Sequence, residues 1–346
     1  MPAKGILIRF SMNTEHHIRC FYGQEDRNQL QITPIQGDAS TRRYYRVSGP
    51  KGSAIACCDP LLRETTTDDY PFLIVYDLLR RNDIPVPEVI AVNAGEGLLL
   101  IEDCGTLQLQ YLVFPECGSL AADIYRDVID TLAGIQAITG DSSQLPFRLS
   151  FDREKLMFEF DFFIEHALMG YFAPVSGGVD VGALRSEFKA IADILVQPER
   201  FVLNHRDFHS RNIMIRDGKP VIIDFQDARM GLPQYDAVSI IRDSYVALDQ
   251  TLADELKTRH YQALMDRNGI TMSHDEYLYL FDLMAFQRNI KAIGTFSYQT
   301  AVLKKTQYEH SIAPALRYLP DYISGRNELK KAGRLLQPVI EQRHER

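Results

Sequence analysis

The stretch between residues 202 and 228 constrains the fold of this chain more than any other segment. It reads VLNHRDFHSRNIMIRDGKPVIIDFQDA, which is a short apolar strand, a polar loop, and two further strands joined by a tight Asp-Gly-Lys turn. Asp207 lies in the polar loop, and Asp224 follows the last strand. A short hairpin returns the chain on itself, so we expect these two carboxylates on adjacent chain ends.

The polar side chains of this segment match the ligands that Mg²⁺ prefers. Asp207, Asn212 and Asp224 offer two carboxylates and one amide, and Mg²⁺ takes oxygen ligands from a few protein groups together with substrate phosphates. Burying Asp224 after an apolar strand would also be costly unless a cation paired with it. In the alternative interpretation, both aspartates are turn or cap residues and Asn212 only begins a strand. The complete order of residues favours the functional interpretation.

Alternating apolar residues and turn signals indicate that a small β-rich unit comes first. Strands are expected within residues 30–59, a helix over 68–82, and a hairpin over 89–103 with its turn at 93–97. Helical patterns dominate after Gly105. One helix is expected to begin at Ser119, with an inward face formed by Leu120, Ile124, Val128, Leu132 and Ile135.

These patterns predict an α+β chain of two lobes. We expect an N-terminal extension over residues 1–27, a small β-rich lobe over 28–103 and a larger helical lobe over 104–346. The charged segment 325–346 is expected to fray at the end of the chain.

The charge balance argues against several classes of function. The chain has 46 acidic residues against 38 Lys and Arg, a net charge of −8, whereas a duplex-binding surface needs clustered cations. We therefore expect no nucleic-acid partner. The five cysteines form no CxxC pair, so neither a zinc knuckle nor a disulfide framework is supported. Apolar runs fall far short of the ~20 residues that span a bilayer, and the N-terminus lacks a convincing signal peptide. We expect a cytoplasmic protein without membrane contact.

The catalytic segment resembles that of kinases for small molecules. Its order, His-x-Asp-(x)₄-Asn followed by a hairpin and Asp-Phe, has the form of the catalytic loop and metal-binding aspartate of the protein-kinase-like fold. His209 stands where a protein kinase has a lysine, and no Ala-Pro-Glu motif follows. The sequence HRDFHSRN…IIDFQDARMGLPQYDAVSII is instead similar to the aminoglycoside phosphotransferase and choline kinase superfamily, which implies a two-lobed kinase-like fold.

That resemblance also implies roles for individual residues. Asp207 would be the catalytic base or the residue that orients the acceptor hydroxyl, and Asn212 and Asp224 would hold Mg²⁺. Asp236, in Pro-Gln-Tyr-Asp, matches the position that braces the catalytic loop. Alternatively, Asp236 could cap a helix that starts at Ala237, and we favour bracing.

Three segments resemble a narrower group, the amino-sugar kinases of cell-wall recycling. They are GDASTRRYYRV at residues 37–47, GLLLIEDCG at 97–105 and RNIKAIGTF at 288–296. Those kinases phosphorylate the anomeric hydroxyl of N-acetylmuramate and N-acetylglucosamine. The resemblance implies ATP and Mg²⁺ as cofactors, a small sugar as the partner, and a product that feeds peptidoglycan recycling and nucleotide-sugar synthesis. It leaves the oligomeric state open. Adenine would lie in an interlobe hinge formed by Ile101, Glu102, Asp103 and Cys104.

The first of these segments also has the physical features of a phosphate-binding loop. Its small residues let backbone N–H groups approach phosphate oxygens closely, and its two arginines supply bidentate cations. The candidates for nucleotide binding are Gly37, Asp38, Ala39, Ser40, Thr41, Arg42 and Arg43. The alternative is a plain hairpin turn that carries an exposed arginine pair.

The third strand, residues 54–58, lacks the lysine that pairs with the α and β phosphates in most of this fold. Lys51 lies in the preceding turn, too far back to replace it. Either Arg42 or Arg43 takes that role, or the chain is a pseudokinase that binds without catalysis. The amino-sugar kinases also lack the lysine, which favours replacement. Strand alternation places the two arginines on opposite faces and does not say which faces the nucleotide.

Four further residues are candidates for substrate contact or support. His209 could donate to a phosphate or fasten the loop, and Arg211 lies beside it. Arg288 and Lys291 could meet an anionic group such as the lactyl carboxylate of N-acetylmuramate. They could equally be solvated helix residues, and this second interpretation is the one we favour.

Other small-molecule kinases would share the same catalytic residues. An aminoglycoside, choline, homoserine or methylthioribose kinase is therefore an alternative. A cationic acceptor would require an acidic pocket, so the charge of the pocket discriminates between them. A kinase for protein substrates is disfavoured because no activation segment separates Asp224 from the following helix.

Overall fold

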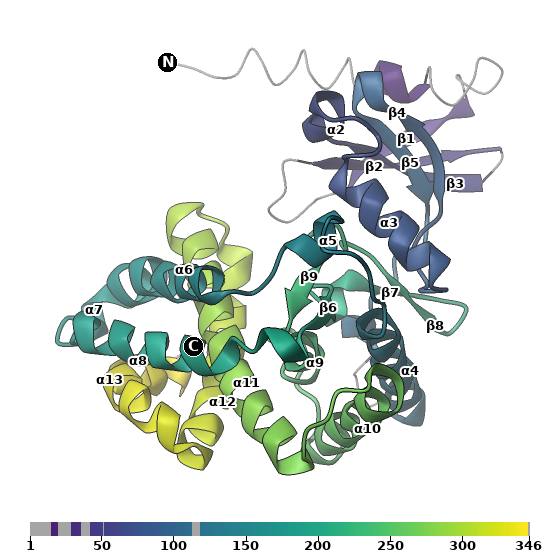
Figure 1. Ribbon diagram of the computed structural model, residues 1–346. Coiled ribbons are helices and arrows are strands. Elements are labelled where there is room, and N and C mark those ends of the chain that lie inside the picture. Colours follow the sequence, from purple (N-terminus) through teal and green to yellow (C-terminus); the bar gives the residue numbers. More distant parts are fainter. Residues whose placement is uncertain (1–14, 20–28, 36–41, 51, 113–117, 345–346) are drawn as a thin grey trace, which may run out of the picture.

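The computed structural model describes residues 15–19, 29–35, 42–50, 52–112 and 118–344 (Figure 1). An antiparallel sheet with two helices forms a small lobe, and a larger lobe made mainly of helices lies below it (Figure 1). The predicted α+β architecture of two lobes is therefore confirmed. The lobe boundaries at residues 27 and 103 stay predictions, and most of the N-terminal extension falls outside the described residues.

The sheet of the small lobe has five strands in the order β1-β2-β3-β5-β4, and every neighbouring pair is antiparallel. The strands are β1 (Gln31–Ile35), β2 (Arg43–Gly49), β3 (Gly52–Cys58), β4 (Val89–Asn93) and β5 (Leu98–Glu102). They confirm the strands predicted within residues 30–59 and the hairpin predicted over 89–103. Gly97 closes that hairpin with φ +63°, and a Cβ there would lie 2.6 Å from the backbone oxygen of Asp59, so no other residue fits.

The two faces of the sheet bury different cores because side chains alternate along each strand. On the outer face, Ala54 and Ala56 of β3 pack with Leu98 and Leu100 of β5 and with Ile18 from the short helix at residues 15–19. The inner-face residues, among them Cys57, Leu99 and Ile101, belong to the core of the large lobe instead. One apolar core therefore runs from the inner face of the sheet into the helical lobe.

Helix α3 joins the lobes. α2 (Pro60–Glu64) is capped by Asp59, and α3 (Pro71–Arg81) confirms the helix predicted over 68–82. Phe72 of α3 is buried and its ring lies 4.9 Å from the ring of Phe225, which follows Asp224. The inner side of the small lobe is thus packed directly against the segment that carries the candidate metal ligand.

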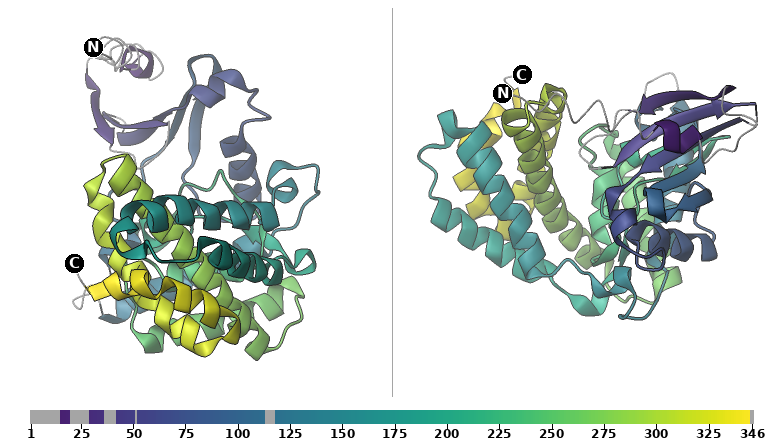
Figure 2. Two further views of the ribbon diagram at one scale, coloured as in Figure 1. Left: turned by 90° about the vertical axis from the view of Figure 1, so that its left-hand side faces the viewer. Right: turned by 90° about the horizontal axis from the view of Figure 1, so that it is seen from above.

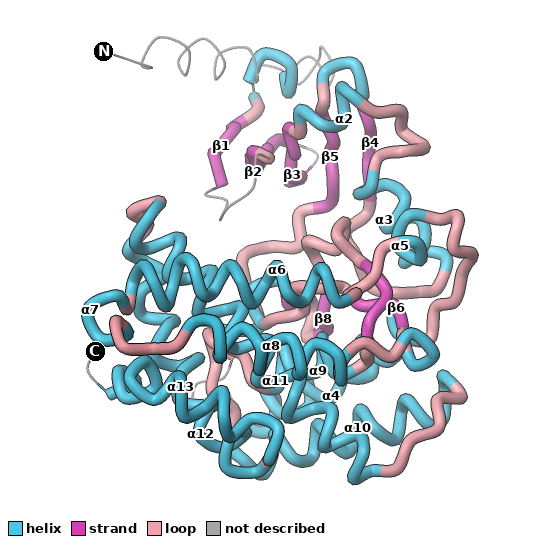
Figure 3. The backbone as a smooth tube through the Cα atoms, turned by 60° about the vertical axis from the view of Figure 1, so that its left-hand side comes forward, coloured by secondary structure: helices cyan, strands magenta, loops and turns pink. Residues whose placement is uncertain are grey.

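The large lobe is built mainly from helices (Figures 2 and 3), and its two small strand pairs lie on the side toward the small lobe (Figure 1). Its helices are α4 (Gly118–Gln136), α5 (Leu145–Arg148), α6 (Arg153–Phe163), α7 (Ala173–Ser176), α8 (Val181–Leu195), α9 (Gln234–Ile241), α10 (Gln250–Asn268), α11 (His274–Ser297), α12 (Ile312–Gly325) and α13 (Lys330–Ile340). Two π-helical segments continue α6 and α11, namely η5 (Ile164–Tyr171) and η8 (Tyr298–Val302). Within the described residues, no helix combines the length and apolar character that a membrane crossing requires.

Four short strands position the catalytic segment. β6 (Val202–Asn204) pairs with β9 (Arg229–Gly231), and β7 (Ile213–Arg216) pairs with β8 (Lys219–Ile222). The polar loop leaves β6 and returns through β7, and the predicted turn at residues 217–219 connects β7 to β8. The hairpin predicted from the sequence is confirmed.

Two local predictions were wrong. Leu120 is 57% exposed although it shares the spacing of the buried residues Ile124, Val128 and Leu132 of α4. The described part of the last segment, residues 325–344, does not fray, because α13 buries an apolar stripe of Ala332, Leu336, Val339 and Ile340 beneath its charged residues. In both cases the charge or the spacing alone did not show which face meets the core.

Candidate active site

Asp236 holds the catalytic loop from inside α9. Its carboxylate is fully buried and accepts the backbone N–H of His205 at 2.5 Å and that of Arg206 at 3.0 Å. Burial raises the pKa of Asp236 to about 6. α9 begins at Gln234, so Asp236 is not the cap of a helix that starts at Ala237. The structure places Asp236 where bracing of the loop was predicted.

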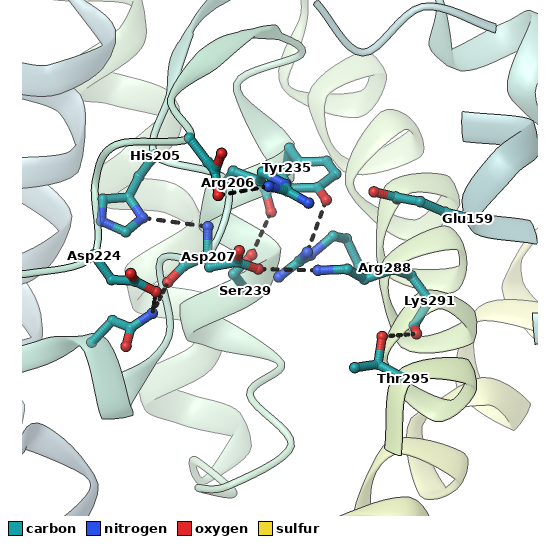
Figure 4. A network of polar contacts seen from close by, with 12 residues as sticks. Glu159, His205, Arg206, Asp207, Asp224, Tyr235, Ser239, Arg288, Lys291 and Thr295 are labelled. Atoms are coloured by element: carbon teal, nitrogen blue, oxygen red, sulfur yellow. Dashed lines mark hydrogen bonds and ion pairs between the residues drawn. The ribbon is translucent and has the colours of Figure 1, made fainter. Parts of the chain in front are cut away.

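The backbone of the loop is unusual at the braced position. Arg206 has φ +87°, in the left-handed region, and an extended loop would not adopt this angle without support. The hydrogen bond to Asp236 supplies part of that support. His205 supplies more, because its Nε2 lies 2.9 Å from the backbone oxygen of Ile223 and its Nδ1 accepts the N–H of Asp207. The buried imidazole thus ties Asp207 to the end of β8 (Figure 4).

Asp207, Asn212 and Asp224 converge as the sequence predicted. The Asn212 amide nitrogen donates to the backbone oxygen of Asp207 at 3.0 Å and lies 3.5 Å from Oδ2 of Asp224. Asp224 has φ +65°, which turns the chain sharply after β8. Its side chain is 45% exposed, and Gln226 donates to its Oδ1 at 2.9 Å. An exposed carboxylate therefore lies beside an amide, at the edge of the space between the lobes.

The donor set at this point suits Mg²⁺. Mg²⁺ keeps several waters and uses one or two carboxylates together with phosphates, and Asp224 and Asn212 supply one carboxylate and one amide oxygen. The described residues contain no cluster of three His, Cys, Asp or Glu side chains that could hold a metal by themselves. A zinc site needs such a cluster. The residues present therefore fit a metal that is shared with a phosphate-bearing substrate.

Arg42 reaches this site from the small lobe. Its Nε donates to Oδ2 of the buried Asp59 at 2.9 Å, and its NH1 lies 3.9 Å from Oδ1 of Asp224. Tyr70 also donates to Asp59, at 2.6 Å. Arg42 lies just before β2, in register with its inward-facing residues, whereas the neighbouring Arg43 is exposed. Burial alone would lower the pKa of Arg42, but its interactions with Tyr44 and with the carboxylate of Asp59 outweigh that effect and raise it.

Lys291 of α11 forms an ion pair with Asp207. Its Nζ lies 3.0 Å from Oδ1 of Asp207, and its side chain is 19% exposed (Figure 4). Burial alone would raise the pKa of Asp207, but the charges of Lys291, Arg206 and Arg288 hold it well below its usual range. Asp207 is therefore ionised at neutral pH.

Arg288 lies one turn earlier on α11 and is only 8% exposed. Its NH1 donates to the hydroxyl of Tyr235 at 2.9 Å, and its guanidinium lies over the ring of Tyr235. The interpretation of Arg288 and Lys291 as solvated helix residues was therefore wrong. Both face the catalytic loop, because α11 packs against α9, and Asp207 forms an ion pair with Lys291.

A pocket of about 120 Å³ opens beside Asp207. Arg242, Arg288 and Lys291 line it together with Asp207 and Asp243. The carboxylate of Asp243 already accepts hydrogen bonds from the backbone N–H groups of Ser210 and Tyr245. The pocket therefore offers three cationic side chains against two carboxylates.

Comparison with known proteins decides the family. A sequence profile described as "Phosphotransferase enzyme family" matches residues 31–267. The chain belongs to this phosphotransferase family. It is 30% identical over 313 residues to an N-acetylmuramate/N-acetylglucosamine kinase of Pseudomonas aeruginosa, with 88% of each chain covered. It is 28% identical over 295 residues to a kinase of the same name from Neisseria meningitidis, covering 83% of this chain and 84% of the relative.

Solved structures agree on the fold. A Plasmodium vivax ethanolamine kinase superposes with a TM-score of 0.62 at 13% identity, covering 87% of this chain and 85% of that one. A choline kinase from Streptococcus pneumoniae gives 0.59 at 13% identity, with 91% and 99% covered. They confirm the predicted kinase-like fold. The family match and the curated relatives confirm the predicted membership of the superfamily, and the chain is a phosphotransferase that acts on small molecules.

The hinge of this phosphotransferase is fixed by polar contacts. Asp103 accepts two hydrogen bonds from Arg46 of β2, at 2.7 and 3.0 Å, and Glu102 forms an ion pair with Arg216. Ile101 is buried within β5. Cys104 packs with Met214 and Val221 in a small apolar cluster below the hinge. The cluster lies next to residues 101–104, where adenine binding stays a prediction.

The structure describes some of the remaining predicted site residues but not others. The proposed phosphate-binding residues Gly37, Asp38, Ala39, Ser40 and Thr41 lie outside the described residues, so their role stays a prediction. His209 packs edge-on against the ring of Tyr245, and burial lowers its pKa to about 3. The Arg211 guanidinium lies 4.9 Å from the centre of the same ring. This geometry favours a fastening role for His209 over donation to a phosphate.

Sequence reasoning missed two carboxylates that organise this site. Asp59 positions Arg42, and Asp243 holds the N–H of Ser210 in the catalytic loop. Both carried a signal that could have been used. Asp59 directly follows an apolar strand, which is nearly the position of Asp224 after β8. Asp243 lies seven residues after Asp236, just past the end of α9.

Proposed function

We propose that this phosphotransferase is an ATP-dependent kinase that phosphorylates the anomeric hydroxyl of an N-acetylated amino sugar, N-acetylmuramate or N-acetylglucosamine. The cationic character of the pocket beside Asp207 carries this proposal. A choline or aminoglycoside acceptor is positively charged and would need acidic walls, whereas this pocket presents Arg242, Arg288 and Lys291. A neutral sugar, or one with a carboxylate, is compatible with such walls.

The names of the relatives support the same acceptor. Two N-acetylmuramate/N-acetylglucosamine kinases match more than four fifths of this chain. The lactyl carboxylate of N-acetylmuramate would find Arg242 and Arg288 within the pocket, and N-acetylglucosamine lacks that group. We expect both sugars to be accepted because the pocket also has an apolar wall from Ala292 and Phe296.

ATP would bind between the lobes. Adenine would rest on the apolar cluster of Cys104, Met214 and Val221, and the phosphates would extend toward Arg42 and Asp224. Arg42 would then replace the missing third-strand lysine, because its guanidinium already lies on the inner face of the sheet next to Asp224. Asn212 and Asp224 would hold Mg²⁺, which neutralises phosphate charge when it is bound.

The residues around Asp207 account for the chemistry. Asp207 accepts a hydrogen bond from the acceptor hydroxyl and aligns its oxygen with the γ-phosphorus. As the new O–P bond forms, the bond from phosphorus to the β-phosphate oxygen breaks, and the hydroxyl proton passes to the Asp207 carboxylate. A carboxylate with a low pKa is a weak base. A weak base is sufficient for an anomeric hydroxyl, because this hydroxyl is more acidic than an ordinary sugar alcohol. Orientation of the acceptor therefore supplies most of the rate acceleration by Asp207.

The proposed product also suggests a place in metabolism. A sugar 1-phosphate is the form that a nucleotidyl transferase needs to make a nucleotide sugar. We therefore propose that the enzyme returns amino sugars from the cell wall to nucleotide-sugar synthesis.

The chemical identity of the product tests the proposal. Purified protein is incubated with MgATP and, separately, with N-acetylmuramate, N-acetylglucosamine, kanamycin and choline, and ADP release is measured. The expected product from an amino sugar gives no reducing-sugar reaction and releases phosphate in mild acid, because departure of phosphate leaves a stabilised oxocarbenium ion. A sugar 6-phosphate keeps its reducing end and survives that treatment.

Asp207→Asn is the control for the same assay. It keeps the shape of the site but should lower turnover by at least ~100-fold, the lower range for a positioned general base. Turnover of choline or kanamycin alone, or an acid-stable reducing product, would overturn the assignment of the acceptor. Neither result would change the family or the fold.

A further inference from the structure

The ammonium group of Lys291 has hydrogen-bond donors that its ion pair with Asp207 does not use. Its ammonium group has three N–H donors, and Oδ1 of Asp207, at 3.0 Å, is the single hydrogen-bond acceptor that the described residues provide for it. Its side chain lines the pocket beside Asp207 and stays 19% exposed. Two donors are therefore available to a molecule that binds next to Asp207.

The catalytic loop supplies no cation at the position where a protein kinase has its lysine. His209 occupies the loop position where a protein kinase has a lysine. Its ring packs against Tyr245 at a centroid distance of 5.3 Å, and desolvation lowers its pKa to about 3, so it carries no charge at neutral pH. The ammonium group that pairs with Asp207 comes instead from Lys291 of α11, 84 residues later in the chain (Figure 4).

The reacting atoms must come close to this ammonium group. An acceptor hydroxyl that donates to Asp207 lies about 2.6–3.2 Å from a carboxylate oxygen, and the Lys291 Nζ lies 3.0 Å from Oδ1 of the same carboxylate. The phosphoryl group forms its new bond to that hydroxyl oxygen. In a loose transition state, negative charge spreads over its three equatorial oxygens. A cation held beside Asp207 is thus next to the place where this charge develops.

We infer that Lys291 is a catalytic residue, which bridges Asp207 and the transferred phosphoryl group and replaces the lysine that the catalytic loop lacks. This inference rests on the proposed kinase function but does not depend on which acceptor is used. The bond to Asp207 keeps the ammonium group in place before the substrates arrive. Stabilisation by a preorganised donor requires no rearrangement during the reaction.

The test is a set of substitutions at Lys291 with steady-state kinetics in both substrates. Lys291→Met keeps the length of the side chain but removes its charge. Removing one preorganised donor should lower kcat by roughly 100- to 1000-fold, while KM for ATP and for the acceptor changes by less than ~3-fold, as expected for an interaction made mainly in the transition state. Lys291→Arg should recover part of kcat, because it restores the charge with different geometry.

Lys257→Met is the matched control. Lys257 is a lysine of α10 with a side chain 10% exposed and an ion pair of 2.8 Å to Asp254, and it does not line the pocket. Its loss should leave kcat within ~2-fold of wild type, as expected for substitutions away from the site. Thermal melting of both variants shows whether the protein is still folded.

Chemical rescue separates catalysis from a structural role. Lys291→Ala opens space in the pocket, and added methylammonium should raise its kcat at least ~10-fold if a cation is needed in the transition state. Methanol at the same concentration should have no effect. Wild-type kcat in Lys291→Met, a loss confined to KM for the acceptor, or the absence of rescue in a folded Lys291→Ala protein would each overturn the inference.

The acceptor panel keeps this test distinct from that of the proposed function. If wild-type protein phosphorylates choline and no amino sugar, the proposed acceptor is wrong. The Lys291 variants are then measured with choline, and the inference stands or falls on its own.

Discussion

Replacing Arg42 should separate the two arginines that the sequence could not distinguish. Arg42→Met removes a guanidinium that lies 2.9 Å from Asp59 and 3.9 Å from Asp224, with a side chain only 13% exposed. Arg43→Met removes the same charge from the neighbouring, exposed position. The pair is a matched comparison, because overall charge and composition change identically while only one variant alters the space between the lobes.

The expected loss in catalysis can be estimated from one charge-assisted interaction. A hydrogen bond to a charged group contributes about 1.5–3 kcal/mol. If Arg42 makes that bond to an ATP phosphate, kcat/KM for ATP should fall roughly 10- to 150-fold, at a factor of ten for each ~1.4 kcal/mol. Arg42→Lys should fall between the two, because it keeps a charge but loses the planar fork. Arg43→Met should remain close to wild type.

Arg42→Met should also cost stability. The carboxylate of Asp59 is 3% exposed and would lose one of three donors, keeping Tyr70 and the N–H of Leu61. Loss of a charged hydrogen bond of this kind costs about 2 kcal/mol. For a chain of this length, an unfolding entropy of about 2.1 cal/mol/K per residue converts that cost into a Tm lowered by roughly 3 °C.

Steady-state kinetics with varied ATP and differential scanning fluorimetry together test this reasoning. Which of the two variants loses activity matters more than how much activity is lost. Impaired catalysis in Arg43→Met with normal catalysis in Arg42→Met would show that the wrong face was assigned. Normal catalysis in both would mean that neither arginine binds phosphate, and would strengthen the pseudokinase alternative.

Two further predictions concern the metal and pH. Asp224→Ala should abolish Mg²⁺-dependent ATP binding and Asn212→Ala should weaken it less, because a carboxylate contributes a full charge and an amide only a dipole; unchanged MgATP affinity of Asp224→Ala in calorimetry would contradict the site. His260 is fully buried between Tyr277 and Gln136, and burial lowers its pKa to about 3. The unfolded chain therefore binds more protons below pH ~6.5, and stability should fall as pH drops from there toward 3, by up to ~1.4 kcal/mol per pH unit. Urea melts between pH 7 and 5 should show a shallower pH dependence for His260→Gln than for wild type, and equal slopes would refute this.

Local signals allowed much of the fold to be predicted. The hairpin over 89–103 was found because its turn residues and its alternation lie within one short segment. The faces of helices were harder to predict. Leu120 has the right spacing but lies in the first turn of α4, and spacing does not show how far a packing partner extends. The charge of the last segment likewise concealed the apolar stripe of α13.

Some residues of the candidate site could be predicted from the sequence, and others could not. Asp207, Asn212 and Asp224 could be predicted because 18 residues, from 207 to 224, contain all three. Lys291 could not be assigned, since its partner Asp207 is 84 residues away and only the packing of α11 brings the two together. The choice between Arg42 and Arg43 required knowing which face of the sheet packs against the large lobe. Alternation places them on opposite faces, but the core decides which face is inward.

The contact between Phe72 and Phe225 limits how this enzyme can close around a nucleotide. Helix α3 and the inner face of the sheet share their core with the large lobe, so a rotation of the whole small lobe would have to pull these two rings apart. β1 is differently placed, because it is an edge strand with four of its five residues exposed. β2 is held more firmly, since Tyr44 packs against the shared core and Arg46 donates two hydrogen bonds to Asp103. We therefore expect closure over bound phosphates to move β1 against the rest of the small lobe, with α3 remaining beside Asp224.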